Sequence, residues 1–152
     1  MGFEITDRVT ELNARLEAFM QTHVYPREHD YEEFTLSPEN LWQTPPWFDD
    51  LRSQAKDAGL WNLFLPKEYE PWSPGLTNLE IATLFETMSK VTWAQPVFNC
   101  SAPDRGNMEV LAKYGTPEQQ EAWLNPLLEG EIRSAYQRQV RLALVHDTYD
   151  AQ

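Results

Sequence analysis

The N-terminal part of the chain carries an apolar stripe that predicts a helix. Thr6 is its expected N-cap. Pro26 is expected to bend or restart the helix, and the polar residues 27–33 are expected to lead into a loop. The apolar residues recur at steps of three and four, which places them on one helix face: Ile5, Val9, Leu12, Leu16, Phe19, Met20 and Val24.

Residues 44–65 predict a second helix and a buried connector. Thr44-Pro45-Pro46 supplies a cap and an N-terminal proline, and acidic residues follow in the first turn. Gly59 is a suitable stop. The apolar run LWNLFL (residues 60–65) is expected to be a buried connector, because no nearby segment has the pattern of a pairing strand. The expected inner face of the helix consists of Phe48, Leu51, Ala55 and Ala58.

Two capping boxes mark further helix starts. Thr77 with Glu80 and Thr116 with Gln119 have the spacing at which side chains and backbone donors satisfy each other. Pro126 is expected to break the last helix before Gly130. The residues expected to face inward are Ile81, Leu84, Phe85 and Met88 in the first of these helices, and Trp123, Leu124, Leu127 and Leu128 in the second.

The stretch VFNCSAPDRGNMEVL (residues 97–111) is apolar or small on nearly every turn, yet it contains Pro103 and Gly106. Two helical pieces are expected to meet at Ser101-Ala102-Pro103, with Ser101 and Asp104 as candidate caps. The small residues leave room for a ligand or another helix, and the residues alone favour a packing kink. Together the patterns predict an all-α fold, a helical bundle of about five or six helices with short loops.

The amino-acid composition indicates which kinds of partner molecule and which cellular compartment to expect. The 24 acidic and 12 basic residues give a net charge of -12, which disfavours nucleic acid and membrane partners and offers no general attraction to an anionic ligand such as coenzyme A. One cysteine, Cys100, excludes an intramolecular disulfide and favours a reducing compartment. With no targeting pattern in the sequence, a cytoplasmic location is expected, or the mitochondrial matrix if the protein is eukaryotic.

Candidate catalytic chemistry is sparse. His23, His29 and His146 lack metal-ligand spacing, so no metal site is expected. The carboxylates fall at cap or solvent positions of the predicted helices. Cys100 is interpreted as a small buried apolar residue more readily than as a nucleophile. No residue is therefore nominated as catalytic.

Four segments resemble the N-terminal helical domain of the FAD-dependent acyl-CoA dehydrogenases. They are LRSQAKDAGLWNLFLPKEY, LTNLEIATLFETMSK, VFNCSAPDRGNMEVLAKYG and TPEQQEAWLNPLLEGEIRSAY, and the resemblance covers residues 10–136. It is strongest to the branch in which some eukaryotic members are fused to a kinase-like domain. The resemblance implies an oxidoreductase that converts acyl-CoA to trans-2-enoyl-CoA with FAD. In that family a glutamate of the C-terminal bundle is the base.

The resemblance also implies site residues. The N-terminal domain supplies part of the wall around the acyl tail, and small or apolar side chains suit an alkyl chain. Core packing is the alternative role for the same residues. Tyr136 matches the start of the strand that contacts the flavin. The positions that match the acyl wall are Phe98, Asn99, Ala102, Pro103, Asn107 and Met108.

The sequence departs from the family after Tyr136. Gln137-Arg138-Gln139 stands where the family has Met-Thr-Glu-Pro. We therefore expect residues 1–136 to form the N-terminal helical domain and residues 137–152 to be a divergent tail, frameshifted or disordered. The chain alone is then expected neither to turn over acyl-CoA nor to retain FAD. The alternative is a helical interaction module that docks on a partner protein, for example a dehydrogenase subunit.

Overall fold

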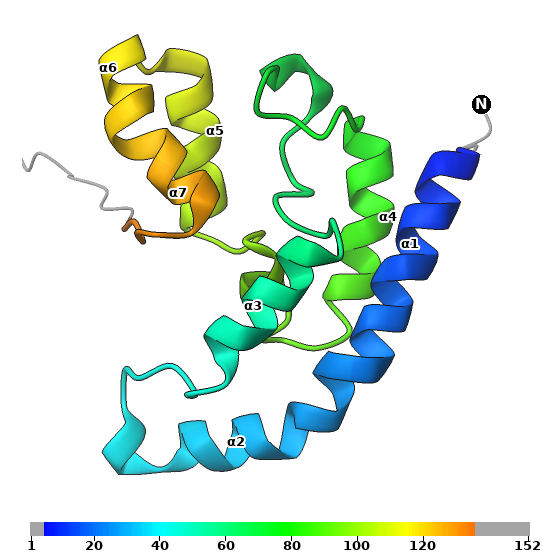
Figure 1. Ribbon diagram of the computed structural model, residues 1–152, viewed down its shortest axis with the longest axis vertical. Helices are drawn as coiled ribbons and strands as arrows, with labels where there is room; N and C mark the ends of the chain where they lie inside the picture. Colours follow the sequence, from blue (N-terminus) through cyan, green and yellow to red (C-terminus); the bar gives the residue numbers. More distant parts are fainter. Residues whose placement is uncertain (1–4, 136–152) are drawn as a thin grey trace, which may run out of the picture.

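The computed structural model describes residues 5–135 and shows helices joined by turns and by two longer connections, residues 58–77 and 89–103 (Figure 1). The all-α prediction is confirmed for these residues, which contain no strand and one isolated bridge between Pro66 and Leu76. Helices α6 and α7 form one rod through the π-helical turn Gln120–Leu124. The helices are α1 (Asp7–Phe19), α2 (Glu28–Leu36), α3 (Phe48–Asp57), α4 (Asn78–Met88), α5 (Asp104–Tyr114), α6 (Pro117–Gln119) and α7 (Asn125–Glu129).

Helices α1 and α4 lie side by side and run parallel (Figure 1). The Thr6 hydroxyl donates to Glu80 over 2.8 Å, and the Thr87 hydroxyl donates to Asn13 over 2.8 Å. In both hydrogen bonds the two partners are 74 positions apart in the sequence. The two parallel helices are therefore aligned in the same way at both ends. Their apolar stripes are buried between them, as the periodicity predicts.

The chain passes from α1 into α2 through a new turn at Pro26, as predicted. The π-helical turn Met20–Val24 and the 3-10 turn Tyr25–Arg27 carry the chain into α2, so the polar residues 28–36 are helical and lead into the turn Pro38–Asn40. Pro26 is tolerated because it lies in the first positions of a new turn, where no backbone donor is needed. Ile5 precedes α1 and is 55% exposed, so it is not part of the stripe.

Helix α3 begins later than expected. Trp47 is the N-cap residue and no side chain caps the helix, so the predicted cap at Thr44 is wrong. The two prolines explain the shift, because a residue that precedes proline is driven out of the helical region. The predicted inner residues Phe48, Leu51 and Ala55 are buried.

The apolar connector is buried as predicted. Leu60, Leu63, Phe64 and Leu65 are at most 3% exposed and join the core cluster with α1, α3 and α4. Gly59, which precedes the connector, has φ +67°, a conformation that glycine adopts without strain. The end of α3 and the connector together place residues 61 and 62 beside the end of α7.

Both capping boxes are present. Thr77 and Glu80 satisfy each other's backbone donors at α4, and Thr116 and Gln119 do so at α6. Two predictions for the last rod are wrong. Trp123 is 51% exposed, and Pro126 lies at the start of α7, where it continues the rod to Gly130.

Helices α5 and α6–α7 form an antiparallel hairpin at one end of the molecule (Figure 1). The Gln120 side chain donates to the Leu111 carbonyl near the turn, and Asn107 donates to Ser134 at the open end. In residues 5–135 no helix has both the length and the apolar character that crossing a membrane requires.

Leu84 and Leu79 on α4 provide a test of the core. Leu84 is fully buried and Leu79 is 44% exposed. We expect Leu84→Ala to lower the free energy of unfolding by about 2–5 kcal/mol, because it leaves a cavity. Leu79→Ala should change it by no more than about 0.5 kcal/mol. Urea denaturation followed by circular dichroism measures both values, and equal losses would contradict the assigned packing.

Candidate functional site

The chain divides before α5 as the sequence predicts. A 3-10 turn, Gln95–Phe98, ends at Asn99, and α5 begins at Asp104. The predicted caps are wrong, because Pro103 occupies the N-cap position and no side chain caps the helix. Asp104 instead accepts hydrogen bonds from another part of the chain.

A groove lies along the first turns of α5. It has a volume of about 510 Å³ and is bordered by three of the predicted site residues, Ala102, Pro103 and Asn107. Gly106 leaves it open, since a Cβ added there would meet no atom within 4 Å. The remaining lining residues are Arg105, Glu109 and Val110. The charges of Arg105 and Glu109 lie 3.9 Å apart, so the groove has no net charge of its own.

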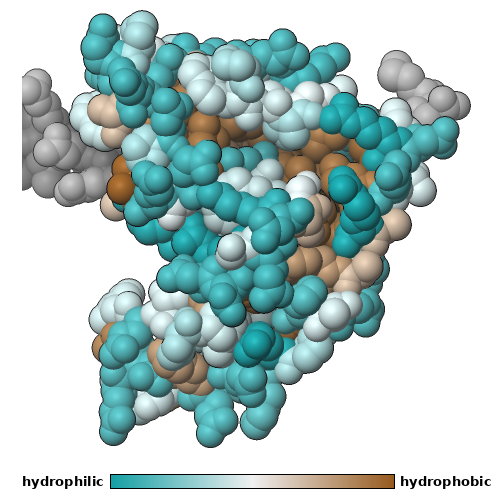
Figure 2. Space-filling view, viewed as in Figure 1, coloured by the Kyte–Doolittle hydropathy of each residue, from teal (hydrophilic) through white to brown (hydrophobic). Residues whose placement is uncertain are grey.

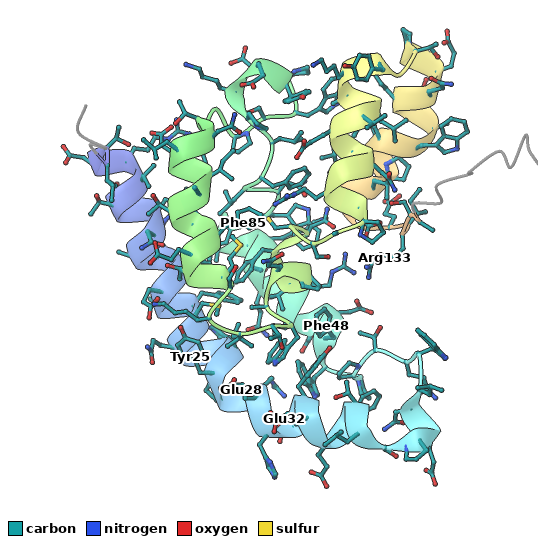
Figure 3. The ribbon with its side chains drawn as sticks, turned by 180° about the vertical axis from the view of Figure 1, so that it is seen from behind. Tyr25, Glu28, Glu32, Phe48, Phe85 and Arg133 are labelled. Atoms are coloured by element: carbon teal, nitrogen blue, oxygen red, sulfur yellow. The ribbon has the colours of Figure 1, made fainter. Side chains whose placement is uncertain are left out.

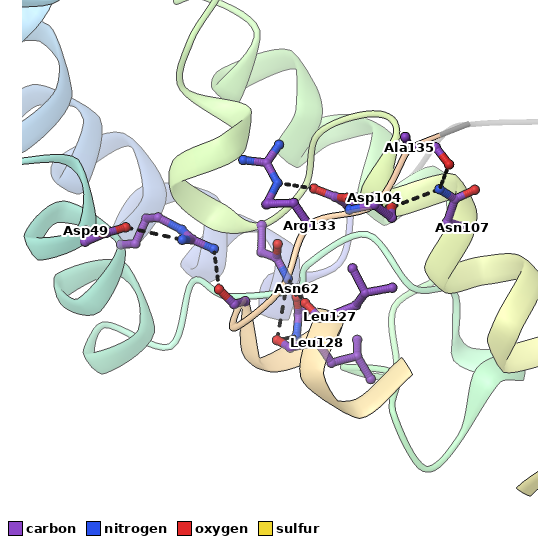
Figure 4. Close-up of polar contacts among 12 residues, drawn as sticks. Asp49, Asn62, Asp104, Asn107, Leu127, Leu128, Arg133 and Ala135 are labelled. Carbon is purple, nitrogen blue, oxygen red and sulfur yellow. Dashed lines mark hydrogen bonds and ion pairs between the residues drawn. The ribbon is translucent and has the colours of Figure 1, made fainter. Parts of the chain in front are cut away.

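The other three predicted residues lie in the interior. Phe98 and Met108 are fully buried in the core cluster, behind the groove. Asn99 is 6% exposed and has φ +55°, a left-handed conformation that asparagine adopts more readily than most residues. Its amide donates to the Leu127 carbonyl (2.9 Å) and to Asn62 Oδ1 (2.8 Å), as Figure 4 shows in part. Asn99 therefore caps the end of α7.

A buried carboxylate holds residues 133–135 against α5 (Figure 4). Asp104 is 3% exposed and accepts three hydrogen bonds: from Arg133 Nε (2.5 Å), the Ser134 backbone N–H (2.6 Å) and the Ser134 hydroxyl (2.6 Å). Asn107 Nδ2 donates to Ser134 Oγ over 2.8 Å and to the Ala135 carbonyl over 3.4 Å. The carboxylate thereby fixes both residues 133–135 and the side chain of Asn107, which lines the groove.

The pKa of Asp104 reflects this environment. Burial raises the pKa, but the hydrogen bonds from Ser134 and Arg133 together lower it more, so the pKa lies below its ordinary value. The carboxyl is therefore ionised at neutral pH, and its charge compensates the donors that surround it.

A second groove, of about 370 Å³, lies between α5 and the α6–α7 rod. Asn107 borders both grooves. Apolar side chains dominate the lining of the second groove, and Trp123 (51%) and Ile132 (40%) are exposed at its rim. Figure 2 shows that hydrophobic side chains reach the surface in this half of the molecule.

Cys100 is fully buried, and burial raises the pKa of its thiol to about 12. Thiolates are the nucleophilic form of cysteine, so this side chain packs in the core and does not act as a nucleophile. Among residues 5–135, His, Cys, Asp and Glu form no group of three suited to a metal ion.

Comparison with known proteins shows which family this chain belongs to. The family described as "Acyl-CoA dehydrogenase, N-terminal domain" matches residues 6–131. The chain belongs to the acyl-CoA dehydrogenase family. The resemblance found in the sequence is thereby confirmed at the level of the family and of its N-terminal domain.

Three relatives show the extent of the similarity. The chain is 46% identical over 135 residues to mouse acyl-CoA dehydrogenase family member 10, covering 87% of this chain and 12% of that protein. It is 44% identical over 138 residues to the probable acyl-CoA dehydrogenase FadE2 of Mycobacterium tuberculosis, covering 90% and 33%. A solved structure of a Mycobacterium abscessus protein, titled as an acyl-CoA dehydrogenase, matches with TM-score 0.76 and 44% identity, covering 86% and 33%. The chain thus spans at most a third of these proteins.

Within residues 5–135 of this acyl-CoA dehydrogenase domain, every buried side-chain nitrogen and oxygen has a hydrogen-bond partner. Tyr136, the residue that matches the flavin-contacting strand, lies outside the described residues.

Sequence reasoning missed the Asp104 cluster in this domain. Asp104 was taken as a helix cap, because its partners Arg133 and Ser134 lie about thirty residues away and carry no local pattern. The available signal was an acidic residue in an otherwise apolar or small stretch, since a buried carboxylate requires hydrogen-bond partners.

Replacement of Asp104 tests the cluster. Asp104→Asn should lower the free energy of unfolding at pH 7 by about 1–3 kcal/mol, because Arg133 and Ser134 lose a charged hydrogen-bond acceptor. The folded pKa lies below the unfolded value, so this stabilisation is present above about pH 4 and is lost as the pH falls through the folded pKa. Chemical denaturation of both proteins across pH 3–7 should show the difference shrinking at the acid end. Arg133→Gln is the control, with a smaller effect because Arg133 is 60% exposed.

Proposed function

We propose that residues 5–135 act as the N-terminal helical domain of an FAD-dependent acyl-CoA dehydrogenase and that the groove along α5 forms part of the wall around the acyl tail. The observation that carries this proposal is the position of Ala102, Pro103 and Asn107. Three positions that match the family's acyl wall border one accessible groove. An alkyl chain binds by burial of apolar area and makes few polar demands, which suits this lining.

The six candidate residues divide into two roles under this proposal. Ala102, Pro103 and Asn107 contact the acyl tail. Phe98 and Met108 form the packed support behind the groove, and Asn99 fixes the end of α7. Because Arg105 and Glu109 neutralise each other, the groove does not select the phosphates of coenzyme A. Those phosphates are bound by groups other than the lining of this groove.

The reaction proposed for the whole enzyme is oxidation of an acyl-CoA to its trans-2-enoyl-CoA, for which bound FAD accepts the hydride. The share of the described residues is to surround the tail and exclude water from it. Tyr136 is proposed, on its match to the family, to contribute to the flavin site.

A second candidate role concerns the groove between α5 and the α6–α7 rod. We propose that it docks another part of a dehydrogenase, either a further domain or a subunit. The exposed apolar side chains of Val110 (57%), Trp123 (51%) and Ile132 (40%) support this role, since contiguous exposed apolar surface marks interfaces.

A substitution at Gly106 tests the acyl wall. Residues 6–135 of this chain would replace the corresponding part of M. tuberculosis FadE2, a relative of 44% identity. In this chimera Gly106→Leu should fill the groove and lower kcat/KM for a long-chain acyl-CoA by about tenfold, with a smaller loss for a short-chain substrate. Steady-state assays with a chain-length series measure the effect.

Gly106→Ala is the matched control for that experiment. It should raise the stability of α5 by about 0.5–1 kcal/mol, because glycine is a poor helix former, and it should leave the chain-length preference nearly unchanged. An equal loss for all chain lengths in Gly106→Leu, or no loss, would contradict the assignment of the groove.

Flavin retention is a separate test. The 152-residue chain, purified after expression with excess FAD, should carry no flavin, because the resemblance matches only Tyr136 to the strand that contacts the flavin in the family. The visible absorbance spectrum of the pure protein measures this directly. The chimera is the positive control and should be yellow. A stoichiometric flavin band in the short chain would overturn the expectation.

A further inference from the structure

One projecting part of the molecule adds little to the core. Residues 28–47, named here the acidic arm, comprise α2, the 3-10 turn Pro38–Asn40 and the residues that return to α3. No residue of α2 is buried. In Figure 1 α2 runs along the bottom of the molecule, away from the α1–α4 pair. Its contribution to the core is limited to partial burial, in which Tyr31 packs against the core cluster.

The arm exposes large apolar side chains. Leu36 is 81% exposed, Leu41 is 64% exposed and Trp42 is 95% exposed. Trp42 also has φ +67°, a left-handed conformation that is rare and strained for a bulky residue. Tryptophan is the residue type most enriched among the energetic anchors of protein interfaces. The fold itself gives this side chain no packing role.

The backbone turn that carries Leu41 and Trp42 is tied by hydrogen bonds. Asn40 Nδ2 donates to the Phe34 carbonyl over 3.0 Å, which ties the turn to α2. The Gln43 N–H donates to the Asn40 carbonyl over 2.9 Å. At the base of the arm the Tyr31 ring stacks on Trp93 with centroids 4.7 Å apart. A surface that is already ordered loses less entropy when a partner binds.

The charge of the arm has one sign. Figure 3 places Glu28 and Glu32 one turn apart on α2. Residues 28–47 contain no Lys or Arg. The carboxylates of the arm are all exposed and belong to Glu28, Asp30, Glu32, Glu33 and Glu39. Like charges gathered in this way attract a cationic partner and repel an anionic one.

A groove in the arm has the chemistry to hold a basic side chain. It has a volume of about 530 Å³, and its lining includes the carboxylates of Asp30 and Glu33 and the rings of Phe34 and Trp47. At the edge of this groove, Arg27 of the chain itself contacts both an aromatic ring and a carboxylate. Its guanidinium lies 4.8 Å from the centroid of the Trp47 ring and 4.0 Å from the Asp30 carboxylate. Carboxylates beside aromatic faces favour Lys and Arg by ion pairing and cation–π attraction.

The partner's chemistry follows from these features. A second copy of the chain would bring its own carboxylates to the arm, and the net charge of -12 opposes that contact as well as nucleic acid or anionic lipid. We propose that the acidic arm is a docking surface for a basic protein segment. A Lys or Arg side chain enters the groove between Asp30 and Glu33, and a neighbouring apolar side chain packs on Trp42 and Leu41. This proposal does not depend on the acyl-wall assignment.

The test is selection from a display library of random short peptides on the immobilised 152-residue protein. The enriched peptides should combine Lys or Arg with an adjacent aromatic or aliphatic residue. Synthetic copies of them, measured by fluorescence anisotropy, should bind more weakly as the salt concentration rises.

Variants of the arm decide where the peptides bind. Trp42→Asn keeps a residue that accepts the left-handed conformation, and the double variant Asp30→Asn/Glu33→Gln removes the charge of the groove. Each should weaken binding by at least about tenfold. The controls are Leu79→Asn, another exposed apolar residue, and Glu11→Gln/Glu121→Gln, another exposed carboxylate pair. Both controls should bind as the parent does, and circular dichroism checks that every variant is folded.

Four outcomes would overturn the proposal. The selection could enrich no peptide, or only peptides without basic residues. Binding could survive the arm variants. Sedimentation could show self-association that Trp42→Asn abolishes, which would make a second copy the occupant. Vesicles with anionic lipid could bind the protein through Trp42, which would make a membrane surface the occupant.

Discussion

The hydrogen bonds to the Asp104 carboxylate are the constraint on which the open end of the α5 hairpin depends. Three donors converge on one buried carboxylate and hold residues 133–135 against the first turn of α5. Through Ser134 the same group orients Asn107, which borders both grooves. A neutral residue at this position would lose the charge that strengthens these hydrogen bonds, and Asn107 would lose part of its support at both grooves.

Local signals predicted much of the fold, and contacts across the sequence explain the rest. The stripes of α1 and α4 and the two capping boxes depend on residues three or four positions apart, so the sequence alone revealed them. The two prolines had different outcomes. The sequence predicts that Pro26 bends or restarts the helix, and a new turn does begin there. Pro126 was expected to break the last helix, but it lies in the first positions of α7, where its missing donor has no consequence.

The resemblance pointed to six candidate positions between residues 98 and 108, and three of them, Ala102, Pro103 and Asn107, border one groove. Their role as part of the acyl wall stays a prediction. The sequence alone could not distinguish these groove-lining residues from Phe98 and Met108, which lie in the core. Apolar and small residues are equally suited to core packing and to contact with an alkyl chain. Asn99 differs again, since its left-handed backbone and its bonds to α7 give it a capping role that depends on residues almost thirty positions away.

Two parts of the surface differ in their local charge, although the chain as a whole has a net charge of -12. Along α5 the paired Arg105 and Glu109 leave a groove without net charge, which suits an uncharged alkyl chain. On the acidic arm five carboxylates have no Lys or Arg among them, and the adjacent exposed tryptophan lies in a strained conformation. Because charges beyond a Debye length of about 8 Å are largely screened at physiological salt, the carboxylates of the arm act chiefly on a partner that comes close to them.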